Sequence, residues 1–239
     1  MTDVLPVALA ALWGALTGAL LPRAAYRFTT PQGTPWRTTC EAADHPLPGW
    51  LGTRPCPQCP RTKTATLPLA TATICALLAL ATGPRPELAA WLAVTPVATL
   101  LTTVDLRVHR LPDPLTLPLT PAVLALLALA TRLPDHTGTY RTALYGALTL
   151  GIAYLALHLL NPSGMGFGDV KLAPALGAAL GWYGWPTLML GTFATFTTGA
   201  LYGLTLLLTR RATRKSAIPF GPFLLTGTLL GVLAGAYTS

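Results

Sequence analysis

The segment Gly164-Met165-Gly166-Phe167-Gly168-Asp169-Val170-Lys171 separates two long apolar stretches of the chain. Its three glycines at alternate positions allow unusual backbone angles and close approach of neighbouring groups. Asp169 is one of only eight acidic residues in the protein, and an acid at the edge of apolar sequence is costly to bury without a partner or a function. Two interpretations follow: a glycine loop with a solvated Asp169 at the next helix N-terminus, or a functional acid.

The rest of the chain has the composition of a membrane protein. Of its 239 residues 52% are hydrophobic and 10% are charged, against about 25% charged residues in soluble domains. A spanning helix needs about 20 apolar residues. The chain contains long uncharged runs at residues 4–22, 64–84, 88–104, 114–131, 142–168, 172–209 and 216–239. An aromatic turn at Gly181–Pro186 divides the longest run, so we predict an all-α polytopic membrane protein with about eight transmembrane helices.

The basic residues predict how the chain is oriented. With the N-terminus outside, thirteen Lys and Arg residues fall in inside loops and three in outside loops, a strong positive-inside bias. We predict a multi-pass protein of the cytoplasmic (inner) membrane. Residues 1–27 form a retained first helix, 28–63 a short cytoplasmic loop with cysteines, and 64–239 a multi-helix domain. A basic inner face beside anionic lipid accounts for the net charge of +8, so we expect the bilayer as partner and no nucleic acid.

The polar loop at residues 28–63 contains candidate zinc ligands. Cys56 and Cys59 have the two-residue spacing that lets two thiolates chelate one zinc ion. A tetrahedral site needs two more ligands, and Cys40 and His45 lie in the same loop. A structural zinc is one interpretation. The other is an unmetallated thiol pair in a reducing cytosol, where disulfides are uncommon.

Asp105 follows seventeen uncharged residues, so we predict that it lies near the same membrane boundary as Asp169. Two carboxylates a few Å apart cannot both ionise easily and titrate as a unit. One member can then take a proton from a water molecule while the other donates a proton to a scissile carbonyl. The alternative for Asp105 is an ion pair with Arg107 or Arg110. Asp113 is interpreted as a turn residue or an N-cap.

Three motifs then resemble one family, the prepilin peptidases, which are intramembrane aspartic proteases that process leader peptides of type IV pilins and pseudopilins. The tetrad Gly166 to Asp169 resembles the family's Gly-x-Gly-Asp signature. Asp105, followed by the strip Leu111 to Pro118, is similar to the first catalytic Asp and its downstream region. The segment Ile218-Pro219-Phe220-Gly221-Pro222-Phe223 is similar to the C-terminal motif. The resemblance covers residues 88–239.

The resemblance implies an aspartic leader peptidase that needs no cofactor for proteolysis. Its catalytic pair is Asp105 and Asp169, and Asp113 belongs to the downstream strip. The residues expected to shape the site are Gly164, Gly166, Gly168, Lys171 and Pro112. The expected substrates are type IV prepilin or pseudopilin precursors, cut between a basic leader and an apolar helix at the cytoplasmic face. By resemblance, the residue before the cut is Gly.

The cysteine loop departs from the family pattern. Family members with a full loop carry two C-x-x-C pairs, and many also N-methylate the new pilin terminus. This chain keeps Cys56 and Cys59, but Ala43 stands where the partner of Cys40 is expected. His45 is a candidate replacement ligand. S-adenosylmethionine is required only if methylation occurs.

Two other functions stay open from the sequence. In a proton- or cation-coupled transporter, Asp105 and Asp169 would form an ion site beside a broken helix. In a non-enzymatic scaffold for pilus assembly, both acids would be dispensable.

Overall fold

A computed structural model describes residues 4–41, 44–56, 66–162, 164–210 and 218–239. These residues form eight α-helices and no β-strand. The helices are α1 (Val4–Phe28), α2 (Thr66–Thr82), α3 (Glu87–Val108), α4 (Asp113–Ala130), α5 (Tyr140–Leu160), α6 (Phe167–Trp182), α7 (Trp185–Leu208) and α8 (Gly221–Thr238). The predicted all-α fold is confirmed.

Six of these helices are long and apolar enough to cross a membrane, namely α1, α3, α4, α5, α7 and α8. The other two have 17 residues in α2 and 16 in α6. At a rise of about 1.5 Å per residue they reach about 25 Å, short of the roughly 30 Å of a bilayer core. The class of polytopic membrane protein is thus confirmed, while two of the predicted helices are shorter than a full span.

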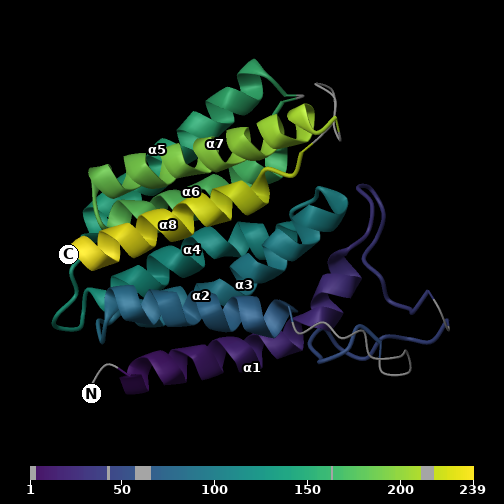
Figure 1. The fold of residues 1–239 in the computed structure, drawn as a ribbon, viewed down its shortest axis with the longest axis horizontal. Coiled ribbons are helices and arrows are strands. Elements are labelled where there is room, and N and C mark those ends of the chain that lie inside the picture. Colours follow the sequence, from purple (N-terminus) through teal and green to yellow (C-terminus); the bar gives the residue numbers. More distant parts are fainter. Residues whose placement is uncertain (1–3, 42–43, 57–65, 163, 211–217) are drawn as a thin grey trace.

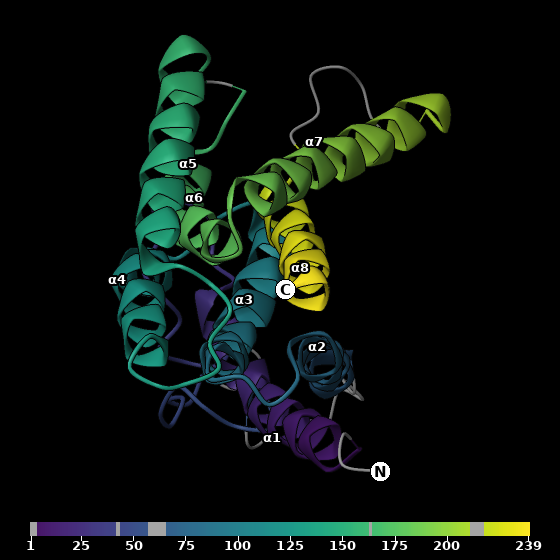
Figure 2. The same ribbon diagram turned by 90° about the vertical axis from the view of Figure 1, so that its left-hand side faces the viewer.

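The helices lie side by side, and the start of α1 and the end of α8 lie at the end of the bundle opposite residues 29–41 and 44–56, the described part of the polar segment after α1 (Figure 1). Helix α6 is central, because it packs against α4, α5, α7 and α8 and most of its residues are buried. Figure 2 shows α7 leaning away from the bundle at its far end. The most buried helix is therefore the one that begins in the glycine segment.

Close packing of α5 on α6 depends on small residues. A Cβ atom on Gly177 would lie 2.2 Å from the carbonyl oxygen of Gly146, and one on Gly146 would lie 2.3 Å from that of Gly177. Helices in membranes associate through such small-residue contacts, because lipid leaves little hydrophobic force between them. This contact sets the position of α6 in the bundle.

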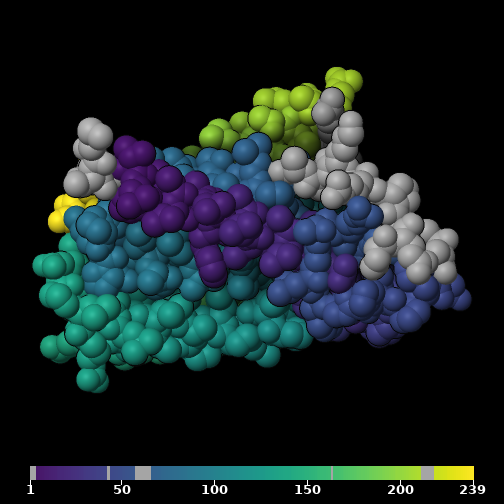
Figure 3. All heavy atoms as spheres, turned by 90° about the horizontal axis from the view of Figure 1, so that it is seen from below, coloured from purple at the N-terminus to yellow at the C-terminus, as the bar shows by residue number. Residues whose placement is uncertain are grey.

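Two arginines near the end of α1 hold the polar segment against that helix. Arg23 donates to the carbonyl oxygens of Pro48 at 2.7 Å and Leu51 at 2.9 Å. Arg27 donates to Gly49 at 2.5 Å. Figure 3 shows the described residues of this segment, 29–41 and 44–56, beside the end of α1. Both guanidinium groups therefore bind backbone carbonyls of the segment that follows α1.

Candidate active site

Asp105 lies in the last turn of α3 and is only 4% exposed. The helix ends where His109 takes a left-handed conformation, with φ of 50°, and its amide donates to the Asp105 carbonyl. The Asp105 carboxylate accepts a hydrogen bond of 3.0 Å from the amide of Gly221, the first residue of α8. A Cβ atom on Gly221 would lie 2.7 Å from Asp105 Oδ2. Only glycine therefore allows this approach.

Asp169 lies in the first turn of α6 and is 6% exposed. Its carboxylate is hydrogen-bonded by the backbone of Gly166, the N-cap of the helix. This arrangement is the acidic half of a capping box, in which a side chain at N3 returns to the N-cap amide. A Cβ atom on Gly168 would lie 3.0 Å from the Cβ of Leu111. The glycine segment thus starts a helix and lets the chain after α3 pack close to it.

The two carboxylates line one polar cavity of about 310 Å³ and are close enough for their charges to interact. Each is bound by a glycine amide at the start of a different helix, where the helix dipole stabilises negative charge. The cavity is also lined by Gln32, Trp36, His109, Arg110, Leu111, Asp113, Gly166, Phe167, Gly168 and Lys171. The structure therefore places both predicted acids in one site, at the same end of the bundle.

Lys171 and Asp113 form an ion pair on the cavity wall, with Nζ 2.7 Å from Oδ1. Lys171 also lies over the ring of Phe167, 5.0 Å from its centre. The interpretation of Asp113 as an N-cap is wrong: Pro112 is the N-cap of α4, and Asp113 is in the first helical turn. The proline fixes the helix start one residue earlier, which leaves the Asp113 side chain available to Lys171.

Three of the five predicted site-shaping residues line the cavity, namely Gly166, Gly168 and Lys171. The other two lie outside its lining. The Gly164 amide donates to Asn161 in the preceding turn. The Pro112 carbonyl accepts the Thr116 amide at the start of α4. Their contribution is to the loops that carry the acids.

The polar segment supplies a wall of the cavity that the sequence did not indicate. Arg110 stacks on Trp36 at 4.0 Å and donates to the carbonyl oxygens of Pro31 at 3.0 Å and Thr34 at 3.2 Å. These contacts hold Gln32 and Trp36 at the cavity. Arg110 is thereby engaged away from Asp105. The ion pairs among the described residues are Arg37–Glu41 and Lys171–Asp113, so the ion-pair interpretation of Asp105 is not supported.

Gly221 was also missed as a site residue. Its motif was recognised, but no role was assigned to the glycine. A signal was present in Pro222, because proline in the first turn marks a helix start, and a helix start offers free amides to an anion.

A second group of side chains lies in the polar segment, where Cys40, His45 and Cys56 have ligand atoms within 4.8 Å of one another. The Cys56 sulfur lies 2.9 Å from His45 Nε2. Two thiols and an imidazole are donors that zinc prefers, and this spacing fits ligands that share one ion. The fourth predicted ligand, Cys59, lies outside the described residues.

Comparison with known proteins places the chain in a family. A model described as "Type IV leader peptidase family" matches residues 92–204. A prepilin leader peptidase/N-methyltransferase of Aeromonas salmonicida is 34% identical over 83% of this chain and 72% of the relative. The chain belongs to the type IV leader peptidase family. A protein of the same name from Aeromonas hydrophila is 35% identical over the same shares.

More distant relatives carry the same name. One from Pseudomonas aeruginosa is 32% identical over 70% of this chain and 57% of the relative. No solved structure matches the chain. Family membership confirms the resemblance inferred from the three motifs and makes the chain a peptidase, consistent with the aspartic type. It lends no support to the transporter alternative.

Proposed function

We propose that this peptidase removes the leader from type IV prepilin-like precursors, with Asp105 and Asp169 as its catalytic pair. One observation carries the proposal: two buried carboxylates from different helices face one polar cavity at the end of an apolar bundle. The names of the relatives, prepilin leader peptidase/N-methyltransferase, support the substrate class.

The proposed reaction is hydrolysis of one peptide bond by general acid–base catalysis. The ionised carboxylate takes a proton from a water molecule, and the water oxygen attacks the scissile carbonyl carbon. The protonated carboxyl donates its proton to the carbonyl oxygen, which gives a tetrahedral intermediate. When that intermediate collapses, the C–N bond breaks and the leaving nitrogen takes the proton that the first carboxylate accepted. The second carboxylate takes back a proton from a hydroxyl of the intermediate as the new carbonyl forms, which restores the starting pair. No metal or thiol takes part in these steps.

The two glycine amides position the acids for this reaction. Gly221 binds Asp105 and Gly166 binds Asp169, so each carboxylate keeps one oxygen on a fixed donor while the other is free for water or substrate. A preorganised pair loses little free energy in orientation when substrate arrives. We propose that the cavity opens to the cytoplasmic face, with the N-terminus outside, so that the bond cut lies between a basic leader and an apolar helix.

The polar segment after α1, which contains the cysteines, is proposed to hold a structural zinc ion. Cys40, His45 and Cys56 would supply three ligands and Cys59 the fourth. A metal there would cross-link the segment that also carries Trp36 of the cavity wall. The names of the relatives suggest that the chain also N-methylates the cut product, in which case S-adenosylmethionine is a co-substrate.

The test is co-expression with a type IV prepilin-like precursor, followed by the size and N-terminal sequence of the product. The wild type is expected to cut once, after a leader glycine. Asp105→Asn and Asp169→Asn should each lower cleavage by about 10²–10⁴-fold, because each removes one proton-transfer group. Asp135→Asn is the matched control, since Asp135 is exposed in the α4–α5 connection. Cleavage by either active-site variant at the wild-type rate would refute the catalytic pair.

A further inference from the structure

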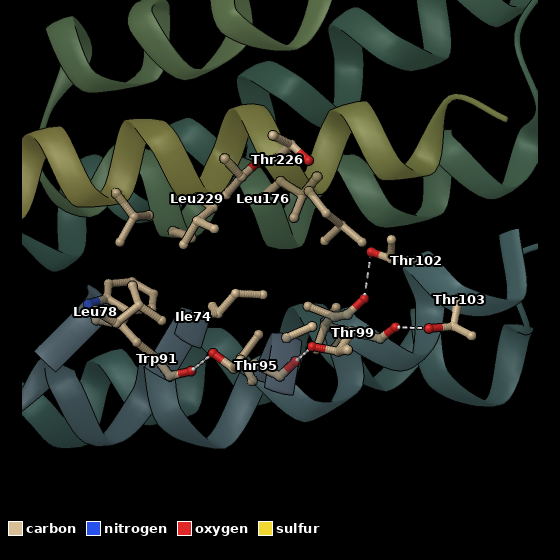
Figure 4. A pocket seen from close by; sticks show the side chains of 18 of the residues that line it. Ile74, Leu78, Trp91, Thr95, Thr99, Thr102, Thr103, Leu176, Thr226 and Leu229 are labelled. Carbon is tan, nitrogen blue, oxygen red and sulfur yellow. Dashed lines mark hydrogen bonds between the residues drawn. The ribbon is translucent and has the colours of Figure 1, made fainter. Parts of the chain in front are cut away.

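A second cavity, of about 500 Å³, lies within the bundle and is almost entirely apolar. Figure 4 shows side chains of α2 and α3 on one side and of α6 and α8 on the other. Figure 2 shows α2 and α8 as separate helices on the same side of α3. Of the described residues that line the cavity, only Arg107 is charged. We call this cavity the apolar groove.

The floor of the groove is the face of α3 that carries a series of threonines. Thr95, Thr99 and Thr103 donate their hydroxyls to the carbonyl oxygens four residues earlier, at 2.7, 2.9 and 2.8 Å. Because these hydroxyls are satisfied within the helix, the surface they leave is made largely of methyl groups. Ala98 lies among them. The floor therefore presents small apolar groups, which let another helix approach closely.

The groove ends beside the catalytic cavity. Leu106 and Arg107 line the groove, whereas Asp105, in the same turn of α3, lines the cavity. Helices α6 and α8 also contribute residues both to the acid pair and to the groove. Their first turns carry Asp169 and Gly221, and their later turns carry Leu176 and Leu225 on the groove wall. Three helices thus connect the acid pair with the groove.

We propose that the apolar groove receives the apolar helix of the substrate, the part that follows the bond to be cut. This inference rests on the proposed function. Along α3 the lining residues extend from Trp91 to Arg107, a length of about 24 Å at the rise of an α-helix. A helix that leaves the acid pair toward the bilayer runs beside this floor. The groove volume of about 500 Å³ can hold one row of side chains from a helix that lies along the groove.

The geometry sets a register between the two helices. Ala98 lies seven positions before Asp105 in α3, which is about 10 Å along the axis. A substrate helix has the same rise per residue, so its residue about seven positions after the cut lies at the depth of Ala98. By the same reasoning, residues about three and eleven positions after the cut lie at the depths of Thr102 and Val94.

The test places a benzophenone side chain at single positions of the precursor's apolar helix. Asp169→Asn enzyme is used so that the substrate stays uncut. After illumination, the linked residues of α3 are identified by mass spectrometry. The expected result is a ladder in which probes about three, seven and eleven positions after the cut link near Thr102, Ala98 and Val94. Links that fall only on residues outside the groove lining, or links whose depth in the bundle does not follow the probe position, would overturn the proposal.

A kinetic test uses Ala98→Trp, which fills the groove, and Ala93→Trp as its control. Ala93 is on the same helix but is exposed and does not line the groove. Ala98→Trp should raise KM for the membrane-embedded precursor by about tenfold or more, since small displacements of a bound substrate have large effects. Ala93→Trp should keep the wild-type KM. Equal KM values in both variants would show that the groove holds lipid or nothing.

Failure of this inference is distinguishable from failure of the proposed function. If wild-type enzyme does not cut the precursor, or cuts it as slowly as Asp169→Asn, the proposed function is wrong and the groove has no substrate of this kind. If wild-type enzyme cuts the precursor but the ladder is absent, the peptidase function stands and the groove proposal alone is refuted.

Discussion

Replacing Gly221 with alanine tests how the acid pair is held. The added Cβ would lie 2.7 Å from Asp105 Oδ2 and 3.2 Å from its Cγ, whereas ordinary contacts begin at 3.4 Å. The carboxylate must therefore move by about 0.7 Å, the difference between 3.4 and 2.7 Å. That movement lengthens or breaks the 3.0 Å hydrogen bond from the Gly221 amide.

Two routes give the magnitude of the effect. A hydrogen bond to a charged group contributes about 1.5–3 kcal/mol, which is about tenfold to 150-fold in rate if it is lost only in the transition state. A misplacement of about 1 Å at an active site costs about 10²-fold. We expect Gly221→Ala to lower kcat by about tenfold to 10²-fold. Alanine is a better helix former than glycine, so α8 should stay folded.

The assay is the initial rate of precursor cleavage by purified enzyme, with thermal unfolding measured on the same samples. Gly203→Ala is the control, because its Cβ would meet only Ile218 at 3.5 Å, an ordinary contact. Wild-type turnover in Gly221→Ala would refute the view that this amide positions Asp105. Equal losses in both variants would point to general packing of α7 and α8.

Three more predictions concern the surroundings of the site. Arg110→Ala should raise KM more than it lowers kcat, because it removes the cation–π contact and the two hydrogen bonds to backbone carbonyls that hold the cavity wall. Steady-state kinetics separates the two effects. Asp113→Asn should keep most activity and stability, since its partly exposed pair with Lys171 contributes less than about 1 kcal/mol; wild-type-like rates are the readout, and a loss as large as that of Asp169→Asn would make Asp113 catalytic. Cys56→Ser should lose bound zinc, measured by elemental analysis of purified enzyme, and should melt at a lower temperature. The control is Cys75→Ala, which should keep its metal because Cys75 is buried in α2 and is not one of the clustered ligands. Equal zinc contents in the two variants would contradict the metal site.

The sequence was sufficient for the membrane class, the approximate number of helices and the family. These follow from local properties, namely apolar runs, charge placement and short motifs around Asp105 and Asp169. The sequence was not sufficient to predict the role of Asp113. The helix starts one residue earlier than expected, so the Asp113 side chain pairs with Lys171 and does not cap the helix backbone. Helix boundaries near proline depend on backbone geometry that composition does not specify.

What only the tertiary structure decided is which faces of the helices meet. Asp105 meets the amide of Gly221, 116 positions away in the chain, and Trp36 reaches the cavity through Arg110. A membrane helix is apolar on all sides, so its periodicity does not indicate which face packs inward. Close glycine contacts such as Gly146 on Gly177 decide that instead, because in lipid it is steric fit, more than hydrophobic burial, that selects one arrangement of helices over another.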